Sequence, residues 1–155
     1  MYSVVPASPA IAFLLLLFSA PAPHQKPDPL MGTRTLNVAK STFDQGAAPK
    51  SRTARFESFD GGIRVTVKGI NGDGKPLDMK YTARFDGQDY PVSGAGQWDA
   101  LSMKRLDQFT FEQARKKGGQ VLNTARFVVS PDGKVLTVTE TGADGKQIDK
   151  LVFEK

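Results

Sequence analysis

Residues 131–155 read PDGKVLTVTETGADGKQIDKLVFEK and carry the clearest structural pattern in the chain. The first Asp-Gly pair marks a turn, and in the run that follows it Leu136 and Val138 alternate with threonines. A second Asp-Gly pair separates this run from a closing run with apolar residues at 151–153. Turns of this composition between alternating runs are typical of an antiparallel hairpin. The chain is therefore predicted to end in two paired strands.

The same pattern of turn and alternating run recurs toward the N-terminus, back to about residue 33. It is clearest at 63–68, where Ile63, Val65 and Val67 alternate with polar residues. A period of two indicates a strand with one buried and one solvated face. The chain is predicted to be all-β, with about ten short strands. Before the closing hairpin they are expected at 33–38, 51–59, 63–68, 77–85, 89–92, 98–106, 109–116 and 121–129.

Strands that follow one another with short turns form an antiparallel up-and-down meander, each strand pairing with its sequence neighbour. Such a sheet has two exposed edges unless its first and last strands pair. Closure into a barrel is therefore the favoured architecture, and an open sandwich of two sheets is the alternative. A barrel of this size holds either a small ligand or a solid filling of side chains.

Length and composition limit the other possibilities. A chain of 155 residues has room for one domain, and without Cys it contains no disulfide and no thiolate metal site. The net charge of +5 comes from basic residues scattered singly along the predicted strands. Nucleic-acid binding normally needs a clustered basic stripe, so we expect solvated outer faces and no nucleic-acid partner.

The first thirty residues differ from the rest. Residues 10–18, AIAFLLLLF, are apolar but too few to cross a bilayer, and small residues follow them. We expect a signal peptide at 1–22, a Pro-rich linker at 23–31 and the barrel domain at 32–155, in a protein exported to the periplasm or secreted. An uncleaved anchor is the alternative to a cleaved signal peptide, although no stable membrane span is expected.

The two ends of the predicted barrel resemble those of the calycin superfamily, which includes the lipocalins and the fatty-acid-binding proteins. GTRTL at 32–36 followed by TFD at 42–44 is similar to the opening of fatty-acid-binding proteins, where G-x-W-x-L precedes N-F-D. DGK at 132–134, LTVT at 136–139 and VFEK at 152–155 are similar to the last two strands of that family. The resemblance implies a closed barrel that binds a small hydrophobic molecule, as in an exported bacterial lipocalin-like protein.

The chain departs from the family pattern at three places. Arg34 stands where the family has Trp, which is expected to remove the usual plug at the barrel base. Residues 45–50 are too few to form the family's helical lid. Leu151 and Phe153 stand where the family has the Arg and Tyr that clamp a fatty-acid carboxylate. The resemblance therefore bears on the barrel more than on the ligand, because a fold does not fix a function.

The candidate ligand-lining residues are those predicted to point into the barrel. Arg105 is included because it shares the parity of Leu101 and Met103, so it either meets a partner or an anionic group inside, or reaches solvent at the strand end. The orientation of Arg126 stays open. Plain core packing is the alternative role for the whole set. The candidates are Met79, Tyr81, Met103, Arg105, Leu136, Val138, Leu151 and Phe153.

No catalytic residue is assigned, because no known catalytic motif is present and the single His, His24, lies in the predicted linker. NGDG at 71–74 resembles part of a calcium loop, but Thr82 stands where that loop needs a Glu, so a turn is favoured. We expect no metal and no cofactor. The predicted function is non-enzymatic binding of a small apolar or amphipathic molecule by a monomer. The alternative is a structural or interaction module of the cell envelope with a solid core, and an apolar cavity of about 300 Å³ would distinguish the two.

Overall fold

The computed structural model describes Met1 and residues 27–155. The predicted signal peptide, most of the predicted linker and His24 lie outside the described residues. Within them, the chain is all-β apart from one 3-10 turn, η1 (Val38–Lys40). The strands are β1 (Gly32–Leu36), β2 (Thr42–Phe43), β3 (Ser51–Phe59), β4 (Gly62–Ile70), β5 (Pro76–Ala83), β6 (Tyr90–Ser93), β7 (Ala100–Arg105), β8 (Thr110–Lys117), β9 (Gln120–Val129), β10 (Val135–Gly142) and β11 (Gln147–Glu154).

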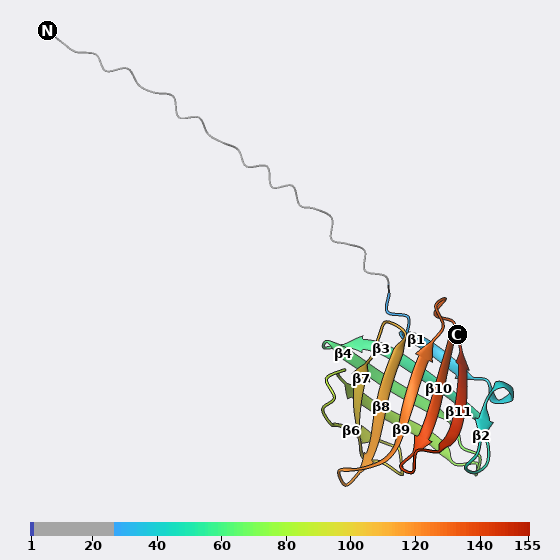
Figure 1. Ribbon diagram of the computed structural model, residues 1–155. Helices are drawn as coiled ribbons and strands as arrows, with labels where there is room; N and C mark the ends of the chain where they lie inside the picture. The colour runs from blue at the N-terminus through green and yellow to red at the C-terminus, as the bar shows by residue number, and fades with distance from the viewer. Residues whose placement is uncertain (2–26) are drawn as a thin grey trace.

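The sheet closes into a barrel, as the meander predicts. From β3 to β11 every strand pairs antiparallel with its sequence neighbours, and β1 pairs with both β3 and β11. Leu36 lies opposite Phe153 at the closure, and Figure 1 shows β1 and β11 side by side. The ten-strand barrel is thus confirmed, and the open sandwich is excluded.

The short strand β2 is an extra piece of the same seam. It continues along β11 after β1, with Phe43 opposite Asp149, and the turn η1 separates the two. At this interruption the Ser41 hydroxyl accepts the backbone N–H of Val152 at 2.9 Å. A side chain thereby satisfies a donor that the broken strand leaves without a carbonyl partner.

The inward faces follow the predicted parity. Ile63, Val65, Leu136 and Val138 are all buried, as their alternation predicts. On β9 the parity was unresolved from the sequence, because apolar residues stand at both odd and even positions. There Ala125, Phe127 and Val129 point inward and are buried, whereas Leu122 and Val128 are exposed on the outside.

The two ends of the barrel differ. Residues 28–31 cross one end, at the top of Figure 1, where β1 begins and β11 finishes. The loops between β2 and β3, β4 and β5, and β6 and β7 surround the other end, together with the hairpin turns β8–β9 and β10–β11. We call these the closed end and the mouth. In the described residues no helix is long and apolar enough to cross a lipid bilayer.

The closed end is sealed by residues that were assigned to the linker. Leu30 is only 1% exposed and belongs to the hydrophobic core. Its backbone N–H donates to the Asp28 carboxylate at 3.0 Å, and the backbone N–H of Met31 donates to the Asp28 carbonyl. The packed domain therefore begins at about residue 28, four residues before the predicted boundary.

Arg34 fills the closed end, so the expectation that it removes the plug is wrong. The side chain is fully buried, and its terminal nitrogens donate to the carbonyl oxygens of Pro29, Gly133 and Lys134 at 2.7, 3.0 and 3.3 Å. Three carbonyl partners keep the cation solvated inside the fold. The long aliphatic stem supplies the packing, so an Arg closes this end in place of an aromatic ring.

Candidate functional site

The mouth opens into a cavity of about 650 Å³. Its walls come from the loop before β3, the turn before β5, the loop before β7 and the inward-facing residues at the mouth ends of eight strands. Polar and charged side chains are frequent in it, together with the single Trp, Trp98. Inward-facing lining residues are Phe43, Arg52, Val67, Leu77, Met79, Arg115, Asn123, Glu140 and Asp149.

A smaller cavity of about 60 Å³ lies deeper in the barrel. Most of its lining is apolar, and it is formed by side chains from β3, β4, β5, β8, β9, β10 and β11. Arg52, Val67, Met79 and Arg115 line both spaces, so the polar mouth leads into the apolar interior. The remaining lining residues are Ala54, Phe56, Val65, Tyr81, Gln113, Phe127, Leu136, Val138, Leu151 and Phe153.

A chain of polar side chains crosses the boundary between the two cavities. The Arg115 guanidinium forms an ion pair with Glu140 at 2.7 Å and donates from Nε to the Gln113 side-chain oxygen at 2.8 Å. The Gln113 amide nitrogen in turn donates to the Tyr81 hydroxyl at 3.1 Å. Burial raises the pKa of Tyr81 to about 12, so the phenol is neutral at physiological pH. The four side chains hold one another in place through these contacts, so the floor of the mouth cavity carries polar groups in fixed positions.

Arg52 lies beside this network with few partners of its own. It is opposite Gly69 on β4, where a Cβ would lie 2.1 Å from the Ser51 carbonyl oxygen. Only glycine fits this close approach of two strands, so no side chain stands next to Arg52 on β4. One Arg52 terminal nitrogen is 3.4 Å from the Asn71 side-chain oxygen, and its buried Nε has no hydrogen-bond partner. Burial lowers the pKa of Arg52, while the nearby Glu140 carboxylate opposes that shift.

Asp149 completes the charged residues at this level. Its carboxylate accepts the backbone N–H of Asp44 at 3.0 Å. Burial raises the pKa of Asp149, and the neighbouring Glu140 carboxylate acts in the same direction. The four charged groups Arg52, Arg115, Glu140 and Asp149 carry two positive and two negative formal charges, so they sum to zero at neutral pH.

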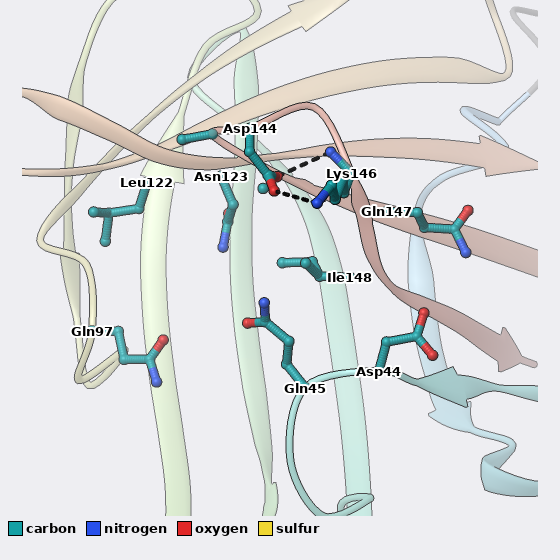
Figure 2. A pocket seen from close by; sticks show the side chains of 11 residues that line it. Asp44, Gln45, Gln97, Leu122, Asn123, Asp144, Lys146, Gln147 and Ile148 are labelled. Atoms are coloured by element: carbon teal, nitrogen blue, oxygen red, sulfur yellow. Dashed lines mark hydrogen bonds and ion pairs between the residues drawn. The ribbon is translucent and has the colours of Figure 1, made fainter.

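An outer shelf widens the mouth beside the β10–β11 turn. This space of about 580 Å³ shares Gln45, Gln97, Asn123 and Ile148 with the mouth cavity. Figure 2 shows Gln45, Asn123 and Ile148 around its centre, and the ion pair of Lys146 with Asp144 at its edge. The shelf is polar and open, so it offers hydrogen-bonding groups without an apolar floor.

Six of the eight predicted ligand-lining residues line the inner cavity. They are Met79, Tyr81, Leu136, Val138, Leu151 and Phe153. The other two lie elsewhere: Met103 is buried in the core, and Arg105 is at the closed end.

Arg105 belongs to the seal of the closed end. It forms an ion pair with Asp28, and its guanidinium carbon lies 4.6 Å from the Phe85 ring centre and 4.3 Å from that of Phe111. Arg105 combines the two expected environments, because it ends β7 with its side chain 30% exposed and also has an acidic partner, which comes from the segment assigned to the linker. Arg126 points outward and pairs with Glu112 on the barrel surface.

Sequence reasoning missed the polar part of the site, which consists of the charged residues Arg52, Arg115, Glu140 and Asp149 and the neutral Gln113. The sequence does indicate that these residues point inward, because each of them stands an even number of positions from the apolar inward residues of its own strand. Arg52 precedes Ala54 and Phe56 at intervals of two, and Glu140 follows Leu136 and Val138 in the same way.

Residues 71–74 form a turn, as predicted. Gly74 donates its backbone N–H to the Asn71 carbonyl at 3.0 Å, and the Asp73 carboxylate accepts the backbone N–H of Lys75 at 3.0 Å. Within the described residues, no three His, Cys, Asp or Glu side chains gather closely enough to hold a metal ion.

Comparisons with known proteins leave the family open. No protein-family model matches the chain, and no curated protein sequence matches it. One solved structure to which the chain is similar is a redesigned β-barrel, mFAP1, bound to DFHBI. The two share 14% sequence identity, with a TM-score of 0.44, over 82% of this chain and 95% of the other.

Proposed function

We propose that this protein binds a small amphipathic molecule at the mouth of the barrel, without catalysis. The observation that carries the proposal is the continuous hollow, in which a polar cavity of about 650 Å³ shares four lining residues with an apolar one of about 60 Å³. Concave sites with an apolar wall and a few oriented polar groups are typical of small-molecule binding. A ligand with one polar and one apolar end matches this gradient.

The dimensions favour an amphipathic ligand over a long lipid. The apolar cavity is well below the volume of about 300 Å³ expected for a carrier of drug-sized apolar molecules. The closed end is filled by Leu30, Arg34 and the Arg105–Asp28 pair, which leaves no tunnel for a long chain. Most of the ligand would therefore occupy the mouth, with only a short apolar part below it.

We include three further statements in this proposal. The protein is a member of the calycin-like barrels, in line with the resemblance of its first and last strands. It is exported, because residues 10–22 have the composition of a signal peptide. It acts as a monomer, because pairing of β1 with β11 closes the meander and leaves only the two-residue strand β2 paired on one side. N-terminal sequencing of the mature protein and size-exclusion chromatography test the second and third statements.

A second function is favoured by one specific observation. The half of the barrel next to the closed end is packed with buried side chains, and the apolar cavity above it is about 60 Å³. This is below the volume of about 300 Å³ that distinguishes the two functions, so the size of the apolar cavity by itself favours the second. Such an interior also suits a structural or interaction module of the cell envelope, in which the barrel presents its loops and outer face to a partner.

Ligand screening with a blocked mouth distinguishes the two functions. NMR titration of the full-length protein with a panel of short amphipathic molecules, bearing neutral, cationic and anionic headgroups, is expected to shift resonances of residues at the mouth. Met79→Trp places a bulky ring where the two cavities meet and should abolish these shifts. Val128→Trp adds the same ring on the outer face of β9 and serves as the matched control. If no member of the panel binds, or if both variants bind alike, the mouth is not a ligand site.

A further inference from the structure

Arg52 is the inward-facing cation whose donors are least used. A guanidinium has five N–H donors, and Arg52 makes one hydrogen bond, at 3.4 Å. By contrast, Arg115 pairs with Glu140, and Arg105 pairs with Asp28. Among the described residues, no carboxylate oxygen lies within 4.0 Å of an Arg52 nitrogen. Arg52 is half-buried, its Nε is buried without a hydrogen-bond partner, and an arriving anion would use the donors that are left open.

The surroundings of Arg52 make it accessible to a ligand in the hollow. The side chain lines both the mouth and the inner cavity. Gly69, its neighbour on β4, offers no side chain that could cover it. A ligand group at this position would lie above the apolar wall formed by Ala54 and Phe56, the next two inward residues of β3.

We propose that Arg52 anchors the carboxylate of a short-chain monocarboxylic acid whose apolar end fills the inner cavity. This inference rests on the proposed function, since it names the ligand class of the same site. A carboxylate matches the planar fork of a guanidinium, which binds it through two parallel hydrogen bonds.

The charges of the hollow select a single negative charge. Glu140 and Asp149 line the same space and would repel a second anionic group. Glu140 pairs with Arg115 at 2.7 Å, and neither Glu140 nor Asp149 forms an ion pair with Arg52, although both carboxylates act on it through the cavity. One carboxylate can therefore use the open guanidinium donors, and it must do so against the repulsion of these two acids. A dianion such as a phosphate monoester would carry a second negative charge. The site has no second guanidinium available to pair with it, because Arg115 is already paired with Glu140.

The depth of the cavity limits the apolar end. Inward residues on a strand are spaced by about 7 Å, so the distance from the level of Arg52 to that of Ala54 corresponds to roughly five carbons of an extended chain. The inner cavity of about 60 Å³ has room for only a few non-hydrogen atoms. Acids of about this length should bind, and longer chains should gain nothing from added carbons.

The test compares the butyrate ion with butyramide, its neutral isostere, on the full-length protein by NMR titration. We expect the carboxylate to bind about tenfold more tightly than the amide, as a charge-assisted pair implies. Arg52→Met should abolish that preference, because it weakens butyrate much more than butyramide, whose oxygen accepts only a neutral hydrogen bond. Arg55→Met is the matched control, because Arg55 lies on the outer face of the same strand and pairs with Glu57. A series from acetate to octanoate should show affinity rising and then levelling at about five carbons.

The outcomes separate this inference from the proposed function. Equal binding of butyrate and butyramide to the unmodified protein would overturn the anion anchor and leave the binding function intact, and this comparison needs no variant. Retention of the carboxylate preference in Arg52→Met would overturn the role of Arg52. If neither butyrate nor butyramide binds, the inference fails, and the wider headgroup panel then decides whether the mouth binds anything. If Arg52→Met does not fold, Arg52→Lys, which keeps the charge but loses the fork, should weaken butyrate more than butyramide.

Discussion

The Arg115 guanidinium lies 2.7 Å from the Glu140 carboxylate at the level where the apolar interior of the barrel meets its polar mouth. Their side chains are 13% and 11% exposed, so each charge depends on the other for most of its stabilisation. We predict that Glu140→Gln destabilises the fold by ~2–3 kcal/mol, because it leaves a largely buried guanidinium without its counter-charge. Urea unfolding followed by circular dichroism measures the loss.

Glu112→Gln is the control for this prediction. Glu112 also pairs with an Arg, at 3.0 Å, but the Arg126 and Glu112 side chains are 55% and 48% exposed on the outer surface. Breaking such a pair should cost less than ~1 kcal/mol. Equal losses in the two variants would show that the Arg115–Glu140 pair contributes no more than a surface pair.

The segment before β1 is predicted to contribute to stability as part of the core. Leu30→Ala removes a side chain that is fully enclosed at the closed end, and such a truncation costs ~2–3 kcal/mol. Leu106→Ala, at an exposed position near the same end, should cost less than ~0.5 kcal/mol. Thermal and urea unfolding compare the two, and a Leu30 variant as stable as the Leu106 variant would place residues 28–31 outside the domain.

Asp149 is predicted to make stability depend on pH in the direction opposite to most carboxylates. Burial raises the pKa of Asp149 in the folded protein above the ordinary value of 3.8. Its contribution to stability is therefore fully present below the unfolded pKa and is lost as the pH rises through the folded pKa. Asp149→Asn removes that loss, so its stability relative to the unmodified protein should be higher at pH 7 than at pH 3, as measured by urea unfolding.

Asp132 provides the comparison of opposite sign. The Ser130 hydroxyl and the backbone N–H of Lys134 donate to its carboxylate and lower its pKa. The stabilisation from this group is present above the unfolded pKa and is lost on acidification. Asp132→Asn should therefore be less stable than the unmodified protein at pH 7, with the difference shrinking at pH 3. The same pH trend in both variants would contradict the assignment of opposite shifts.

Local alternation was enough to predict most of the strands and their buried faces, but neither the short strand β2 nor the inward face of β9. The spacing of Leu136 and Val138 fixes which side of β10 faces the core, because successive residues of a strand point to opposite faces. Closure followed from the count of strands and from the need to remove free edges. Strand positions and buried faces depend on residues that are close in the sequence, and closure depends on the number of strands, so all three can be predicted from a single sequence.

The ends of the barrel could not be predicted in this way. Arg34 reads locally as a polar residue in a first strand, and its partner Gly133 lies 99 residues away. The parity of Arg52 predicts that it points into the barrel, but it does not predict that Arg52 lies at the open end. Which end is open depends on the loops that cover each rim of the barrel. Arg115 on β8 and Glu140 on β10 meet over the intervening strand β9, and no pattern within either strand indicates the pair.

Trp98 should report on occupation of the mouth, because it is the only Trp in the chain and lines that cavity. The Arg115 guanidinium carbon lies 5.0 Å from the Trp98 ring centre, so a ligand near Arg115 changes the polarity around the ring. We predict a saturable change in Trp emission during titration with butyrate, with the same midpoint as the NMR titration. In a Trp98→Phe, Val128→Trp double variant the reporter is on the outer face of β9, and its emission should stay constant while butyrate still binds. A constant Trp98 signal during binding detected by NMR would place the ligand outside the mouth.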